Sequence, residues 1–219
     1  MTGMHRVSQS EPLKSGGAEG NERLTALTGA VLLVLLAAEG FTILSLRQLL
    51  TPHFFIGMLL LGPVALKAGS TIYRFARYYT GSAPYRRKGP PAPLLRLLGP
   101  VVIASTAGVF GTGIALAVTG PAGRQPWLFL HKASFVIWFG AMTIHVLAYL
   151  PRLPRILASE ARGAAPGVTE GSGPGGRAAA VLGGRGLRLA MLVASLVAGL
   201  VIAVLTVHLA VPWGFGGPQ

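Results

Sequence analysis

Residues 127–150 of this 219-residue chain read WLFLHKASFVIWFGAMTIHVLAYL, an apolar run interrupted by two histidines and one lysine. A helix needs about 20 apolar residues to cross the hydrocarbon core of a bilayer, so the run predicts a membrane-spanning helix. His131 and His145 stand fourteen residues apart within it. At that spacing both imidazoles leave nearly the same face of the helix, roughly 21 Å apart along its axis.

The composition of the whole chain agrees with a membrane protein. It is 52% hydrophobic and 11% charged, with a mean hydropathy of +0.60, whereas a soluble domain has about 25% charged residues. The net charge of +13 and the pI near 11.5 do not indicate a nucleic-acid partner, because the basic residues lie between apolar runs and form no patch interleaved with aromatic residues. The absence of cysteine excludes disulfides, iron–sulfur clusters and covalent haem attachment.

Apolar runs of similar length predict five spans, at residues 24–46, 53–73, 98–119, 127–150 and 187–211. Residues 1–23 and 151–186 are expected to form a disordered cytoplasmic tail and a flexible cytoplasmic linker. Because that linker separates the last span from residues 24–150, the expected fold is an all-α integral membrane protein. It comprises a four-helix transmembrane bundle and, in residues 187–219, a fifth transmembrane helix with a short external tail.

The basic residues predict the orientation. Eleven Lys and Arg fall in the loops at 74–96 and 152–185, against Arg47 and Arg124 in the opposite loops. The positive-inside rule therefore places the N-terminus and both basic loops in the cytoplasm and the C-terminus outside. The abundance of Arg, Ala, Gly and Pro is typical of a GC-rich bacterial genome, so we expect the chain to be a multi-pass protein in the lipid bilayer of a bacterial inner membrane.

Ionisable side chains inside spans are costly and usually functional. The spans hold seven: Glu39, His53, Lys67, His131, Lys132, His145 and His208. The spans at 53–73 and 127–150 run in the same direction, so His53 and His131 are expected at one depth near the outer surface. Two facing imidazoles at matched depth can ligate a b-type haem. The alternative for any single histidine is an interfacial residue.

The segments PHFFIGM (52–58) and LHKASFVIWFGAMTIHVL (130–147) resemble the di-haem membrane cytochromes of the cytochrome b superfamily. The resemblance covers about residues 24–150 and is one of histidine pattern rather than close sequence. It implies a four-helix haem-binding bundle in which His53 and His131 ligate the iron of an outer haem b and His145 offers one ligand to an inner haem.

Lys67 departs from that pattern, because it stands where a fourth histidine is expected. Three interpretations are open, in order of preference: Lys67 extends towards the inner headgroups near Arg74, contacts a haem propionate or a quinone, or ligates iron. The first two are preferred, since an amine must lose its proton before it can bind metal. One haem is therefore expected rather than two, and Lys67 is not expected to be an iron ligand.

The remaining polar residues have two interpretations each. We expect Glu39 to form an ion pair with Lys132, with a carboxylate at the haem edge as the alternative. His208 is a reserve ligand or an interface residue. Pro52 predicts the start of the helix that carries His53, and Gly57 one turn later leaves space beside the ring. The small residues of 98–119 suit either close helix packing or a flat macrocycle.

The leading functional hypothesis is a haem-binding membrane cytochrome that moves electrons between a quinone pool and an extracytoplasmic redox partner. The chain holds no nucleotide-binding motif, so we expect an electron-transfer subunit rather than a self-contained enzyme, with a soluble or peripheral oxidoreductase subunit on another chain. The alternatives are a proton- or ion-coupled transporter component, in which Glu39, Lys67 and His145 relay ions, and a non-catalytic membrane anchor.

Overall fold

The computed structural model describes residues 18–87, 93–162 and 184–213, and the regular structure within them is helical. The long helices are α1 (Ala18–Ile43), α2 (Leu46–Tyr79), α4 (Pro93–Thr119), α5 (Trp127–Tyr149) and α8 (Arg185–Thr206). The short ones are α3 (Ala83–Arg87), α6 (Leu153–Arg162) and the 3-10 helices η1 (Leu150–Arg152) and η2 (Val207–Trp213). Five helical stretches are long and apolar enough to cross a membrane. The prediction of an all-α membrane protein is confirmed.

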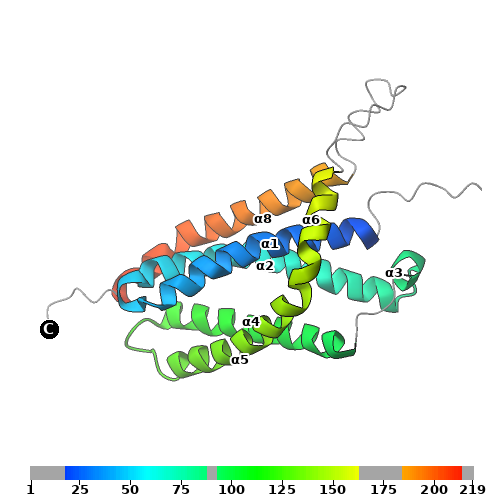
Figure 1. The fold of residues 1–219 in the computed structure, drawn as a ribbon. Helices are drawn as coiled ribbons and strands as arrows, with labels where there is room; N and C mark the ends of the chain where they lie inside the picture. Colours follow the sequence, from blue (N-terminus) through cyan, green and yellow to red (C-terminus); the bar gives the residue numbers. More distant parts are fainter. Residues whose placement is uncertain (1–17, 88–92, 163–183, 214–219) are drawn as a thin grey trace, which may run out of the picture.

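The long helices run alternately in opposite directions along a common axis (Figure 1). One end of the molecule, called here the η2 end, holds the α1–α2 turn, the α4–α5 connection and η2. The other end, called the α3 end, holds α3 and the first turns of α1 and α8. The five passes put Ala18 and Trp213 at opposite ends of the bundle.

The outer surface of the bundle is apolar. Large exposed side chains occur on every long helix, among them Val34, Phe75, Val118, Phe139 and Val204. The fully buried apolar core is small by comparison. Water-soluble monomers rarely expose continuous apolar surface on this scale, whereas hydrocarbon tails solvate it without cost. The apolar surface of these helices is therefore suited to contact with lipid tails.

The helices form two groups. α1 and α8 both pack along α2, while α4 and α5 pack along each other. The two groups touch at few points, chiefly where α4 meets α2 and η2. This differs from the expected division into four helices and an added fifth, because α8 is among the closest neighbours of α2.

Two glycines explain why α8 lies so close to α2. A Cβ atom at Gly62 would overlap the backbone carbonyl oxygen of Ser195, and one at Gly199 would overlap that of Leu59. The backbones therefore meet directly where these helices cross. Small residues permit this approach in a membrane, where packing and not the hydrophobic effect holds helices together.

Several helix boundaries differ from the sequence prediction. α2 begins at Leu46 instead of near Pro52, but Leu49 has non-helical φ and ψ of −108° and 20° and kinks the helix. Pro52 thus lies in the first turn after the kink, where its missing donor is harmless. Residues 18–23, expected in the disordered tail, form the start of α1. The remainder of that tail, residues 1–17, lies outside the described residues.

The expected flexible linker begins with ordered structure. η1 and α6 occupy residues 150–162, and α6 crosses the bundle at a steep angle to pack against α1. Its sequence LPRILASEAR segregates apolar from polar residues at helical spacing, which is typical of a helix lying at a membrane surface. Residues 163–183 of the linker and 214–219 of the expected external tail lie outside the described part of the chain.

Candidate functional site

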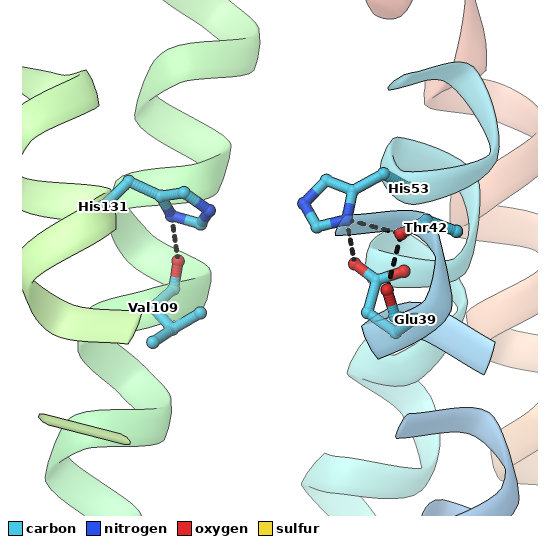
Figure 2. A network of polar contacts seen from close by, with 5 residues as sticks. All are labelled: Glu39, Thr42, His53, Val109 and His131. Carbon is cyan, nitrogen blue, oxygen red and sulfur yellow. Dashed lines mark hydrogen bonds and ion pairs between the residues drawn. The ribbon is translucent and has the colours of Figure 1, made fainter. Parts of the chain in front are cut away.

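His53 is held on α2 by two acceptors from α1. Its Nδ1 lies 2.9 Å from Glu39 Oε1 and 2.9 Å from Thr42 Oγ1 (Figure 2). The Thr42 hydroxyl donates its own proton to the Glu39 carbonyl oxygen, so it can only accept from the imidazole. Nδ1 therefore carries the hydrogen, and in the neutral ring Nε2 keeps a lone pair.

His131 on α5 is held in the same manner by α4. Its Nδ1 lies 3.1 Å from the carbonyl oxygen of Val109 and 3.1 Å from Thr112 Oγ1. A carbonyl can only accept, so Nδ1 donates here too and Nε2 is again the available nitrogen. Gly113 leaves room for the ring beside α4, because a Cβ there would lie 3.2 Å from His131 Cε1.

The two rings face each other across the boundary between the two helix groups. Figure 2 shows both imidazoles at one level, with the nitrogens that bind neither Glu39 nor Val109 at their facing tips. The pair lies near the η2 end. The sequence prediction that His53 and His131 lie at matched depth on facing helices agrees with this geometry.

Polar contacts hold each histidine of the pair within its own helix group. On one side α1 and α2 are joined through Glu39, Thr42 and His53. On the other, Trp138 Nε1 donates to Thr106 Oγ1 at 3.0 Å and ties α5 to α4 below His131. α5 does not pack closely against α2. The two imidazoles are therefore positioned by separate scaffolds with little direct packing between them.

Glu39 is where the structure departs from the expected pairing. It contacts His53, with a side chain that is 14% exposed, while Lys132 lies exposed on α5. The expected Glu39–Lys132 ion pair is therefore wrong. Glu39 Oε2 is buried without a hydrogen-bond partner among the described residues. Gly57 does not open space beside the His53 ring as expected but faces Glu39 Oε1, which a Cβ there would approach to 3.5 Å.

Lys67 points into the interface between α2 and α1. Its Nζ donates to the carbonyl oxygen of Thr25 at 3.0 Å and lies against Gly29, where a Cβ would be 2.9 Å away. The expectation that Lys67 extends towards the headgroups near Arg74 is therefore wrong, because the missing side chain of Gly29 opens a closer place for the amine. His145 on α5 and Lys67 on α2 each lie fourteen residues after a histidine of the facing pair, on helices that run the same way, so helical rise puts the two residues at one level.

His145 and His208 lack the support given to the outer pair. His145 stacks on Tyr149 with ring centroids 4.9 Å apart, and within the described residues its ring makes no hydrogen bond. His208 is exposed in η2. Of the five ionisable residues proposed for cofactor binding or reserve ligation, only His53 and His131 have both a fixed ring and a facing counterpart.

Sequence reasoning missed the residues that hold the rings. Thr42 and Thr112 are single hydroxyls within apolar spans, and Val109 acts through its backbone. The one available signal was spacing: Thr42 lies three residues after Glu39, on the same helical face. Asn21, Thr25 and Ser70, which surround Lys67, were also missed because they lie near the ends of the predicted spans, towards the α3 end.

A larger metal centre is not formed by the described residues, in which no three His, Cys, Asp or Glu side chains gather. Comparisons with protein-family models, with curated proteins and with solved structures found no match to this chain. The functional argument therefore rests on the chain's own side chains.

Proposed function

We propose that this protein is a membrane cytochrome that holds one b-type haem between His53 and His131. The observation that carries the proposal is the facing pair of Nε2 atoms, each on a ring whose Nδ1 is occupied by a hydrogen bond. Histidines that bind metal usually donate their second ring nitrogen in this way, which fixes both tautomer and orientation. An interfacial histidine needs no such support.

The donor set fits a haem better than a bare ion. Two imidazole nitrogens alone do not complete the coordination of a transition metal, and the described residues offer no third ligand at this place. A haem would bring the remaining ligands in its porphyrin, so His53 and His131, one from each helix group, would be enough to hold its iron. The loose contact between α2 and α5 favours a planar group between them.

The chain's own residues set the properties of this site. Glu39 places a carboxylate on His53, whereas His131 has the neutral Val109 carbonyl and Thr112 hydroxyl. The haem would supply reversible one-electron chemistry, and the bundle would supply orientation and a low dielectric. The two ligands therefore differ in electron donation, and the carboxylate side favours the oxidised metal.

The same proposal includes the cellular setting. By the positive-inside rule, the basic loops support an orientation with the α3 end in the cytoplasm and the η2 end, with the histidine pair, towards the outside of a bacterial inner membrane. Electrons would pass between the quinone pool and an extracytoplasmic redox partner. The protein then acts as the membrane subunit of an oxidoreductase whose catalytic subunit is a separate chain.

Haem content of the purified protein tests the proposal. We expect a pyridine haemochrome assay on protein from haem-replete cells to give about one haem b per chain. His53→Ala and His131→Ala should each lose most of it, while His208→Ala, an exposed histidine at the same end, should keep it. Wild-type protein without haem would overturn the proposal and leave the relay and anchor functions. Retention of a low-spin spectrum in both alanine variants would exclude this ligand pair.

A further inference from the structure

Lys67 is a cation held inside the helix bundle without a carboxylate. Its amine donates one hydrogen bond, to the Thr25 carbonyl oxygen, and an ammonium has three donors. No carboxylate of the described residues pairs with it. A half-buried charge with so few partners is costly, which favours a ligand that presents a hydrogen-bond acceptor to the amine.

The polar residues around Lys67 are occupied with one another. Asn21 Nδ2 donates to the Ser70 carbonyl oxygen at 3.0 Å, and Thr25 Oγ1 lies 2.9 Å from Ser70 Oγ. The Thr25 and Ser70 hydroxyls also lie within reach of the backbone carbonyls of Asn21 and Lys67, so one hydroxyl donates to the other and the second donates to its carbonyl. This network joins α1 to α2 and keeps Lys67 in place. The spare donors at this level are therefore the two remaining N–H groups of Lys67 and the second amide hydrogen of Asn21.

His145 supplies a second donor from the other helix group. It lies on α5 fourteen residues after His131, as Lys67 lies on α2 fourteen residues after His53. Both helices run from the η2 end to the α3 end, so the two residues share a level. The ring makes no hydrogen bond with the described residues and is partly exposed, so a ligand dissolved in the bilayer can reach it.

We propose that Lys67 and His145 bind the head group of a para-quinone, each donating a hydrogen bond to one of its two carbonyl oxygens. A quinone is apolar enough to enter from lipid and carries its acceptors at opposite ends of a ring. That shape suits two donors on separate helices. The inference rests on the proposed function, because it names the site at which the cytochrome would exchange electrons with quinone.

A second haem at this level is the less favoured ligand. Lys67 uses its amine as a donor to Thr25, and an iron ligand must offer a lone pair instead. His145 also lacks the fixed Nδ1 contact that both outer histidines have. His53 and His131 at the outer level are therefore suited to bind a metal, whereas Lys67 and His145 at the inner level are suited to donate hydrogen bonds.

Binding of decylubiquinone to the purified full-length protein in lipid nanodiscs tests the inference. Trp138 lies seven residues before His145 on the same face of α5, so its fluorescence should be quenched by a quinone at this site. Trp127→Phe and Trp213→Phe remove the other tryptophans, which lie at the η2 end. Lys67→Met and His145→Phe should each raise the Kd about tenfold, the effect of losing one hydrogen bond to a charged or polar donor.

Two further variants make the result specific. Gly29→Ala keeps the charge but adds a methyl group 2.9 Å from Lys67 Nζ, so it should displace the amine and weaken binding. Lys132→Met removes the exposed lysine of α5 and should leave the Kd unchanged. Equal affinity in wild type, Lys67→Met and His145→Phe would overturn the inference. Two haems per wild-type chain would overturn it as well, because a haem would then occupy the inner level.

Haem content and quinone binding are separate measurements, so the two proposals can fail separately. If the wild type contains no haem but binds quinone through Lys67, the cytochrome proposal fails and the quinone site stands. If it contains one haem and the inner variants bind quinone normally, the reverse holds. His53→Ala protein, expected to lack haem, should still bind decylubiquinone with an affinity close to that of the wild type.

Discussion

Replacing Glu39 by leucine should weaken haem binding at the outer site while leaving the stability of the haem-free protein nearly unchanged. The change removes one of the two acceptors of His53 Nδ1 and leaves Thr42 as the other. A hydrogen bond to a charged group contributes about 1.5–3 kcal/mol. The same carboxylate has a second oxygen buried without a partner, and burying an unpaired polar atom costs about 1–3 kcal/mol. The two effects oppose each other, so the free energy of unfolding of the haem-free protein should change by about 1 kcal/mol or less.

Haem affinity should fall in the same variant. Losing an outer-shell partner of a ligating histidine typically weakens metal binding about 10- to 100-fold, or about 1.4–2.8 kcal/mol. Glu39→Gln is the matched control: it keeps an oxygen facing His53 Nδ1 but not the charge, so it should lie between wild type and Glu39→Leu. The reduction potential should rise in both variants, because the carboxylate favours the oxidised metal.

The assay uses protein from haem-depleted cells. Haem is titrated into the haem-free protein in detergent, and binding is followed by the Soret absorbance. Unfolding of the same sample is followed by circular dichroism. Wild-type haem affinity in Glu39→Leu would refute the role of Glu39 in positioning His53. Loss of more than about 3 kcal/mol of stability would show instead that the Glu39–His53 contact is needed to join α1 to α2.

Three other predictions concern the rest of the molecule. Cysteines introduced at Ser82 and Ala122 should react with a membrane-impermeant label from opposite sides of the membrane, and labelling from one side would contradict the topology. Gly199→Ala should destabilise the protein by at least about 1–3 kcal/mol, the usual cost of overpacking, because its Cβ would overlap the α2 backbone. Gly140→Ala, where a Cβ meets open space, should have little effect on thermal unfolding. Thr112→Val should keep haem with an affinity no more than about tenfold weaker, since the Val109 carbonyl still accepts from His131; complete loss of haem would show that the hydroxyl is indispensable.

Much of the architecture could be predicted from the sequence. The five spans follow from the length of the apolar runs, and the matched levels of His53 with His131 and of Lys67 with His145 follow from equal spacing on two helices that run the same way. These features depend on helical rise and on the cost of polar groups in lipid, which are local properties of each segment. The start of α2 was predicted near Pro52, but a short helical piece precedes the kink at Leu49 and is continuous with the rest of the helix.

The partners of each polar side chain were decided by the tertiary structure alone. Span depth made Lys132 a plausible partner for Glu39, but depth does not say which way a side chain faces, and Glu39 contacts His53. Lys67 reaches Thr25 because Gly29 of another helix leaves room, and α8 lies against α2 because Gly62 and Gly199 meet. Helical periodicity determines which side chains share a face of one helix. The contact between two helices depends on how each is rotated about its axis and on small residues far apart in the chain.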